Sequence, residues 1–274
     1  MPVWSCAACA VEYPDTAAPP AHCPICEDER QYVPRSGQAW TSFDELSRTG
    51  HTLVIADVEP GLYGVSTSPR VGIGQRSLLL QTEAGNLLWD PTGFVDEASA
   101  DLVRALGGVA VIAASHPHMF GAQLEWSRLF DDAPVLVAEA DRDWVQRPGP
   151  AIRFWSDEEE VLPGITLRTV GGHFPGSAVA YWDAGADGRG VVLSGDTIFP
   201  TPDGRWATFM RSYPNTIPLS AAVVDRVATA VTDRPFDRLY GNFGGVIDTD
   251  ARAAVRRSAD RYMAWVSGAN DHLT

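Results

Sequence analysis

The chain has 274 residues, of which 45% are hydrophobic, 20% charged and 9% aromatic. These fractions are typical of a globular protein and exclude global disorder or a fibrous repeat. Its 21 basic residues, all arginine, are outnumbered by 35 acidic ones, and the net charge of −14 disfavours general nucleic-acid binding.

The sequence also argues against a membrane protein. No uninterrupted apolar run reaches the roughly 20 residues that a bilayer-spanning helix needs. The first six residues, Met-Pro-Val-Trp-Ser-Cys, contain no basic stretch before an apolar core and are not typical of a secretory signal. We therefore expect a cytoplasmic protein with no membrane partner.

All four cysteines lie within the first 26 residues, in two Cys-x-x-Cys pairs separated by 13 residues: Cys6, Cys9, Cys23 and Cys26. Two such pairs can surround one ion with four sulfurs about 2.3 Å away. A reducing cytoplasm disfavours disulfides, and few large aliphatic residues are available to fold this segment without a metal. The pattern predicts a four-Cys module over residues 1–40, including a connector.

The four-Cys segment resembles a zinc ribbon or rubredoxin. Its second pair, Cys-Pro-Ile-Cys, is similar to that of rubredoxin, in which iron occupies the four sulfurs. Ala10 and Glu27 stand where glycine usually follows each pair, which favours structural zinc over an electron-transfer iron. The spacing alone leaves zinc and iron open.

Residues 41–274 are predicted to form a second domain of mixed α/β class. A capping box, Ser42-Phe-Asp-Glu45, predicts a short helix. Apolar runs predict strands at 52–58, 77–82, 86–90, 109–114, 134–138, 165–170, 177–182, 190–194 and 236–240. Helical spacing predicts helices near 96–106, 121–130 and 219–231, and from Asp248 or Thr249 to about Val266.

Metal-ligating residues follow three of these strands. His116 and His118 come after the strand at 109–114, His173 after the strand at 165–170, and Asp196 after the strand at 190–194. Loops at strand ends are where α/β folds place ligands. Three imidazoles and one carboxylate suit zinc, iron(II), manganese or cobalt. We expect these four residues to hold one ion.

These motifs, in this order, resemble the metallo-β-lactamase-fold superfamily over residues 50–265. The hairpin that ends at Asp90, the His116-Pro-His118 segment, Gly172-His173 and Ser194-Gly-Asp-Thr197 match four of its motifs. The resemblance implies an αββα sandwich with a metal site along one edge. Asp90 could orient the His116 loop or be an ordinary residue at the start of a loop.

The sequence departs from the family where the second metal ion binds. Phe120 and Gly121 replace an aspartate and a histidine, and Asn242 replaces the histidine of the fifth motif. Phenylalanine and glycine offer no side-chain ligand, and an amide is a poor ligand for such metals. We therefore expect one core ion, zinc or iron, and no second.

Three further residues are candidates for substrate chemistry. Tyr213 could donate a proton to an oxyanion and Arg211 could bind an anion, although packing and a salt bridge are the alternatives. Asn242 could bind a substrate carbonyl or cap a turn. Asp196, Tyr213 and Asn242 are the predicted catalytic residues.

The leading hypothesis is a mononuclear metal-dependent hydrolase acting on a small ester, thioester or lactone through metal-activated water. The second is a mononuclear non-haem iron redox enzyme acting on a sulfur substrate. The third is a catalytically degenerate binding protein that uses the zinc ribbon to dock a partner. The expected partner is a small-molecule substrate, and a homo-oligomer is compatible with the sequence.

Overall fold

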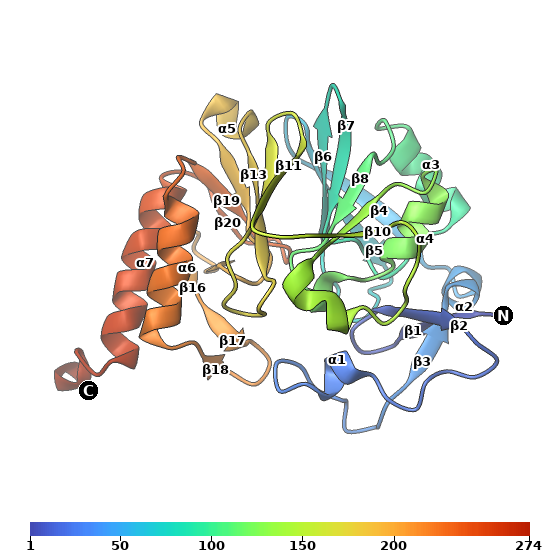
Figure 1. Cartoon of the computed structure of the whole chain (residues 1–274), viewed down its shortest axis with the longest axis horizontal. Helices are drawn as coiled ribbons and strands as arrows, with labels where there is room; N and C mark the ends of the chain where they lie inside the picture. The colour runs from blue at the N-terminus through green and yellow to red at the C-terminus, as the bar shows by residue number, and fades with distance from the viewer. The chain divides into compact units, whose positions relative to one another are not determined.

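The computed structural model describes all 274 residues. They form two compact units, Met1–Trp155 and Ser156–Thr274. Each unit contains one large β-sheet with helices packed on it (Figure 1). The candidate metal ligands are distributed over both units, so each unit is described in turn.

The four-Cys segment forms a small three-stranded antiparallel sheet within the first unit. Its strands are β1 (Val3–Cys6), β2 (Glu12–Asp15) and β3 (Trp40–Ser42), in the order β2-β1-β3. A short helix, α1 (Pro24–Glu27), carries the last cysteine. The four cysteines are buried together with apolar residues such as Val11, Tyr13 and Ile25.

The large sheet of the first unit has seven strands in the order β10-β9-β8-β7-β6-β5-β4. Its strands are β4 (Thr52–Glu59), β5 (Leu62–Ser68), β6 (Ser77–Thr82), β7 (Gly85–Trp89), β8 (Val111–Ala113), β9 (Val135–Ala138) and β10 (Ile152–Trp155). The pairs from β4 to β7 are antiparallel and those from β7 to β10 are parallel. The carboxyl ends of the parallel strands therefore meet at one edge, where the motif loops begin.

Helices α3 (Glu97–Arg104) and α4 (Gln123–Leu129) pack on one face of this sheet (Figure 1). Alternate strand residues such as Leu79 and Ile112 meet Val103 of α3 and Trp126 of α4 in one apolar cluster. Helix α2 (Phe43–Arg48) begins with the expected cap, since the Ser42 side chain accepts from the Glu45 amide. Two 3-10 segments, Pro117–Met119 and Glu139–Trp144, complete the unit.

The second unit contains a six-stranded sheet in the order β11-β12-β13-β14-β19-β20. Its strands are β11 (Glu158–Leu162), β12 (Ile165–Thr169), β13 (Ala178–Trp182), β14 (Val191–Leu193), β19 (Arg238–Tyr240) and β20 (Val246–Ile247). Short pairs are formed by β15 (Phe199–Pro200) with β16 (Ala207–Thr208), and by β17 (Met210–Ser212) with β18 (Ile217–Pro218). The turn α5 (Gly185–Gly188) joins β13 to β14.

Helices α6 (Ala221–Thr232) and α7 (Ala251–Val266) cover one face of the six-stranded sheet (Figure 1). Buried valines on both helices face strand residues in a single apolar cluster. The predicted start of the last helix was wrong by a small margin. The N-cap is Asp250, in the left-handed region at φ 52° and without a side-chain cap, rather than Asp248 or Thr249.

Most predicted elements are present, with ends that differ by one or a few residues. The strands β1–β3, β5, β10, β11 and β20, the short pairs between 199 and 218, and the short helices α1 and α5 were not predicted. The division of the chain at residue 40 stays a prediction, and β3 lies at that point.

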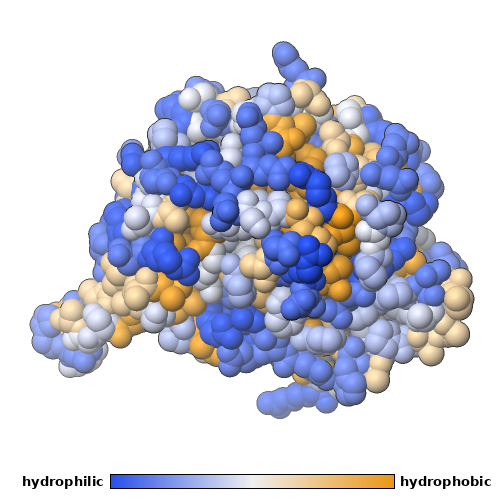
Figure 2. All heavy atoms as spheres, viewed as in Figure 1, coloured by the Kyte–Doolittle hydropathy of each residue, from blue (hydrophilic) through white to orange (hydrophobic).

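The surface is dominated by polar side chains on the face drawn in Figure 2, in keeping with the net charge of −14. Large apolar side chains are exposed at the C-terminal end of α7, at Trp265 and Val266. None of the helices combines the length and the apolar character needed to span a membrane.

Candidate metal centres

The four cysteine sulfurs of the first unit lie close enough together to share one ion. They all lie within 4.8 Å of one another, and the Sγ pairs Cys6–Cys26 and Cys9–Cys23 are each 3.7 Å apart. Sulfurs about 2.3 Å from a tetrahedral zinc are separated by about 3.8 Å, whereas those of a disulfide are about 2 Å apart. The spacing therefore fits a metal-bound tetrad, and all four cysteines are buried and free of disulfides.

Neighbouring groups donate hydrogen bonds to these sulfurs. Tyr13 Oη lies 3.1 Å from Cys23 Sγ, and Gln38 Nε2 lies 3.2 Å from Cys6 Sγ. Burial raises the pKa of the Tyr13 phenol above its ordinary value, so Tyr13 keeps the proton that it donates. Hydrogen bonds from the other thiols, that of Cys23 first, hold the pKa of Cys6 well below its ordinary value. At Cys6 and Cys23 these donors favour thiolate, the form that binds metal, whereas the contacts among the thiols raise the pKa of Cys9 and Cys26.

A pair of histidines follows β8 in the first unit. His116 and His118 are buried, and their ring centroids are 5.1 Å apart with the ring planes at 76°. One nitrogen of each ring lies within 4.8 Å of the other. His116 is in extended conformation directly before the 3-10 turn that carries His118. The geometry allows both imidazoles to ligate one ion.

Asp90 reaches His116 through Ser115. The Asp90 carboxylate accepts from the Ser115 amide at 2.6 Å and from its hydroxyl at 3.0 Å. The same hydroxyl lies 2.9 Å from His116 Nδ1. Asp90 is fully buried and has φ 56°, and its amide donates to the carbonyl of Ala113 on β8. The hydrogen bonds agree with the expected orienting role and add Ser115, which the sequence did not single out.

Positions 120 and 121 cannot supply a second set of ligands in this backbone. Phe120 is buried, and Gly121 has φ 50°. A Cβ at Gly121 would lie 2.3 Å from the Pro91 carbonyl oxygen and 2.8 Å from that of Thr92. A histidine at position 121 would thus clash with backbone as well as adopt a strained φ. Glycine is required by the way this loop packs.

His173 and Asp196 form a second ligand pair within the second unit. Both are buried, and one ligand atom of each lies within 4.8 Å of the other. His173 Nδ1 lies 3.0 Å from the Met210 carbonyl oxygen, to which it donates, so Nε2 is the nitrogen that would ligate. Asp196 follows β14 in a turn that passes through Gly195 at φ 53°.

The predicted catalytic residues of the second unit have definite positions. The Tyr213 hydroxyl donates to the backbone oxygen of Asp196 at 2.9 Å. Burial raises the pKa of Tyr213 well above its ordinary value. Asn242 is buried in the loop between β19 and β20, and Arg211 is half-buried on β17. The roles of all three residues in substrate chemistry stay predictions.

An aromatic wall extends from His173 in the second unit. The ring centroids of His173 and Tyr213 are 6.0 Å apart, those of Tyr213 and Phe199 4.9 Å, and those of Phe199 and Phe243 6.1 Å. Phe199 and Phe243 line a cavity of about 430 Å³ between residues 199–204 and 243–248. Phe243 is 41% exposed, so its ring is accessible to a ligand.

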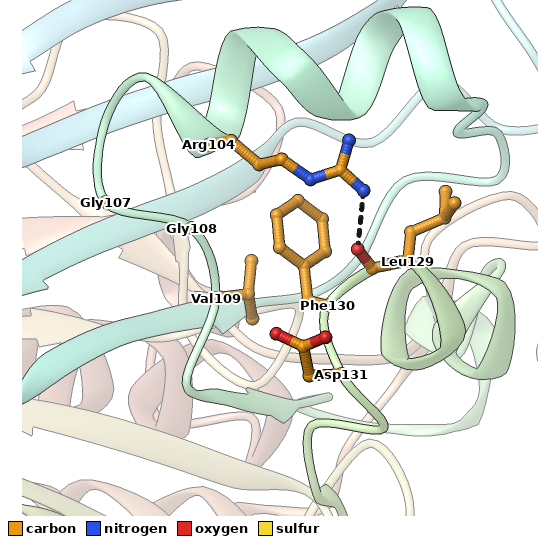
Figure 3. Close-up of a pocket in the computed structure, with 7 residues that line it drawn as sticks. All are labelled: Arg104, Gly107, Gly108, Val109, Leu129, Phe130 and Asp131. Carbon is orange, nitrogen blue, oxygen red and sulfur yellow. Dashed lines mark hydrogen bonds between the residues drawn. The ribbon is translucent and has the colours of Figure 1, made fainter.

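A different cavity, of about 370 Å³, lies in the first unit between the ends of α3 and α4 (Figure 3). The Arg104 guanidinium donates to the Leu129 carbonyl at 2.8 Å and lies over the Phe130 ring. Asp101 and Glu97 also pair with Arg104. Arg104 is thus engaged in contacts within the protein. None of the motif residues lines this cavity, so it is separate from the candidate metal ligands.

The family model of the metallo-beta-lactamase superfamily matches residues 71–263. The chain belongs to this superfamily. A relative from Bacillus subtilis (strain 168), the uncharacterized protein YmaE, is 42% identical over 265 residues, which are 96% of each chain. The relation to YmaE therefore includes the four-Cys segment.

Solved structures confirm the superfamily fold. VMB-1 aligns with a TM-score of 0.58 and 11% identity over 78% of this chain and 98% of its own. FIM-1 from Pseudomonas aeruginosa, in its mono-zinc form, aligns with a TM-score of 0.57 and 14% identity over 77% of this chain and 96% of its own. The mixed α/β fold class of the metallo-β-lactamase type, with an N-terminal four-Cys cluster, is confirmed.

Proposed function

We propose that this protein is a mononuclear metal-dependent hydrolase of a small ester, thioester or lactone. The superfamily fold supports a metallo-hydrolase. In the proposal the histidine pair of the first unit and the His173–Asp196 pair of the second hold a single core ion. The tetrad of cysteines holds a separate, structural zinc.

The observation that carries the mononuclear assignment is the backbone around Gly121. The superfamily places a histidine ligand of its second ion there, and the Pro91 carbonyl oxygen occupies the space that its Cβ would need. Phe120 adds a buried apolar side chain where the superfamily has an aspartate. The mono-zinc form of FIM-1 is an example of this fold with one zinc.

Two of the four proposed core ligands, His116 and His173, are held for ligation by hydrogen bonds to the ring nitrogen Nδ1. Ser115 and Asp90 fix the ring of His116, and the Met210 carbonyl fixes that of His173. Such partners orient imidazole ligands and raise their basicity. A bound ion would polarise a carbonyl and lower the pKa of water to about 7.

Groups beside the proposed ion would bind the substrate. Asn242 is proposed to donate to the substrate carbonyl oxygen, with the aromatic wall as the surface for its apolar part. Tyr213 keeps its phenolic proton, and its bond to the Asp196 carbonyl oxygen fixes the turn that presents the aspartate. An oxyanion would compete with that carbonyl for the Tyr213 proton.

Metal analysis of the wild type and of His116→Ala tests the proposal. We expect two metal ions per chain in the wild type and one in His116→Ala, with turnover of an ester, thioester and lactone panel abolished. His272→Ala, which removes an exposed histidine, is the control and should retain both. Unchanged turnover in a His116→Ala protein without core metal would exclude the proposed mechanism.

The same samples distinguish the other two candidate functions. Iron in the core site, together with oxygen uptake in the presence of thiol substrates, would support the redox enzyme and exclude the hydrolase. Full core occupancy without activity on any panel would favour the binding protein. Two core ions in addition to the four-Cys ion would refute the mononuclear site.

A further inference from the structure

Strand β2 of the four-Cys module contacts the loop that follows His118, and both belong to the first unit. The Glu12 amide donates to the Gly121 carbonyl oxygen at 3.0 Å. The Glu12 carboxylate accepts from the Leu124 amide at 2.5 Å. One residue of the module therefore fixes the chain at two points, three and six residues after His118.

Helix α4 has no cap of its own at this point. Its N-cap residue is Ala122, whose side chain cannot accept a hydrogen bond. The first amides of a helix need acceptors, and their loss costs about 1 kcal/mol. Glu12 supplies such an acceptor from a segment more than 100 residues away in sequence. The conformation of the loop between His118 and α4 thus depends on where Glu12 lies.

An ion pair with the partly buried Arg147 holds the Glu12 carboxylate in place. Glu12 is 2% exposed, and Arg147 Nη1 lies 2.6 Å from its Oε2 and 2.8 Å from Glu125 Oε1. Arg147 therefore has two acidic partners, Glu12 and Glu125. The Leu124 amide, by contrast, donates its hydrogen bond to Glu12. Substitution of Glu125 perturbs the same arginine without removing the contacts to the loop.

The cysteine turn sets the position of β2. The Cys6 amide donates to the Val11 carbonyl at 3.0 Å, and the Ala10 amide donates to the Cys6 carbonyl at 2.7 Å. Ala10 is packed against the backbone at Gly93, where a Cβ would lie 2.2 Å from the Cβ of Ala10. An ion bound by Cys6 and Cys9 would fix the turn that leads directly to Glu12.

We propose that Glu12 is a positioning residue through which the four-Cys metal centre sets the metal affinity of the His116–His118 loop. The proposal rests on the core site proposed above. Loss of the four-Cys ion frees β2, the loop loses its two Glu12 contacts, and the two histidines lose their fixed spacing. Groups that hydrogen-bond directly to metal ligands change metal affinity by about 10–100-fold, and we expect the lower end of this range for the more distant Glu12 contacts.

The test measures metal affinity rather than turnover, on the full chain loaded with cobalt(II). Competition with a chromophoric chelator gives the affinity of each site. The thiolate-to-cobalt charge-transfer band reports the four-Cys site, which also has d–d bands of its own. The d–d absorption that remains after the spectrum of the four-Cys site is subtracted reports the core site. The variants are Glu12→Leu, Glu12→Gln as the conservative rescue, and Glu125→Gln as the matched control.

We expect core affinity to fall at least about tenfold in Glu12→Leu, with altered d–d bands, and to remain within about threefold of wild type in Glu12→Gln. The glutamine retains an oxygen that accepts from the Leu124 amide. Glu125→Gln should bind as wild type does. A folded Glu12→Leu protein with wild-type core affinity and spectrum would overturn the proposal.

If Glu12→Leu does not fold, a measurement on the wild type tests whether the two metal sites are coupled. The chelator is added stepwise, and both bands are followed. Coupling predicts that core affinity weakens once the four-Cys ion has left, and independent release of the two ions overturns it. A wild type that binds no core ion would instead refute the proposed function. It is distinguished from loss of coupling because no d–d absorption remains after the spectrum of the four-Cys site is subtracted.

Discussion

The proposal of a single core ion depends on single residues. A motif comparison shows that Gly121 lacks a side-chain ligand, but not that any larger residue would meet the Pro91 and Thr92 carbonyls. The four proposed core ligands were predicted from the sequence because their motifs are short and local. Ser115 and Met210 were not, because one acts through a hydroxyl of ordinary type and the other through a backbone carbonyl.

The Ser115 hydroxyl gives a residue-scale prediction. Ser115→Ala breaks the connection between Asp90 and His116, and we expect core metal affinity to fall by about tenfold. The variant should also lose about 1–2 kcal/mol of unfolding free energy, because a buried hydrogen bond to a carboxylate is removed. Chelator competition and urea unfolding measure the two effects.

Ser220→Ala is the control for this prediction. Ser220 caps α6, where its hydroxyl accepts from the Val223 amide. We expect the loss of this cap to cost about 1 kcal/mol and leave metal affinity unchanged. An equal fall in metal affinity in both variants would show that Ser115 acts only through general stability.

At the scale of elements, local signals were most informative where a helix begins with a polar cap. Ser42 before α2 is such a case, and the structure shows the bond. The start of α7 was misplaced because Asp248, Thr249 and Asp250 are all capping residue types, and only the backbone selects among them. Strands β10 and β11 lack clear alternation, so the sheet rather than the sequence pattern defines them.

The loops after β14 and β19 give an element-scale prediction. Phe243→Ala opens the cavity beside Phe199, and we expect KM for a phenylacetyl ester or thioester to rise about 5–10-fold. The KM for the acetyl analogue should change less than twofold, because a methyl group does not reach an aromatic wall of this length. Steady-state kinetics with the two acyl groups check this prediction.

Trp265→Ala removes an aromatic residue of similar exposure at the end of α7 and serves as the control. We expect the control to leave both KM values unchanged. Equal changes for acetyl and phenylacetyl substrates in Phe243→Ala would contradict a role in substrate selection.

At the scale of the whole molecule, Glu12 connects stability to pH. Burial raises the pKa of its carboxyl from 4.5 to about 7, despite the opposing Arg147 charge. The folded protein then binds this proton more tightly than the unfolded chain does. Between about pH 4.5 and 7 the Glu12 contribution to stability therefore decreases as pH rises, by up to about 3 kcal/mol.

Urea unfolding from pH 4.5 to 8 tests this contribution in the wild type and in Glu12→Gln. The difference in unfolding free energy between the two proteins should change in favour of the variant as pH rises, and level off above about pH 7. A pH-independent difference would show that Glu12 has an ordinary pKa. Glu125→Gln tests whether the effect is particular to Glu12.

The sequence by itself determined the four-Cys tetrad, the three histidines and the aspartate, and the superfamily. Each depends on residues a few positions apart, whose chemistry does not change with distant packing. Only the tertiary structure showed that Glu12 of the cysteine module caps α4. It also showed that the backbone leaves no room for a side chain at position 121. Those facts arise from contacts between segments far apart in the chain, and hydrophobic periodicity and local spacing carry no information about such contacts.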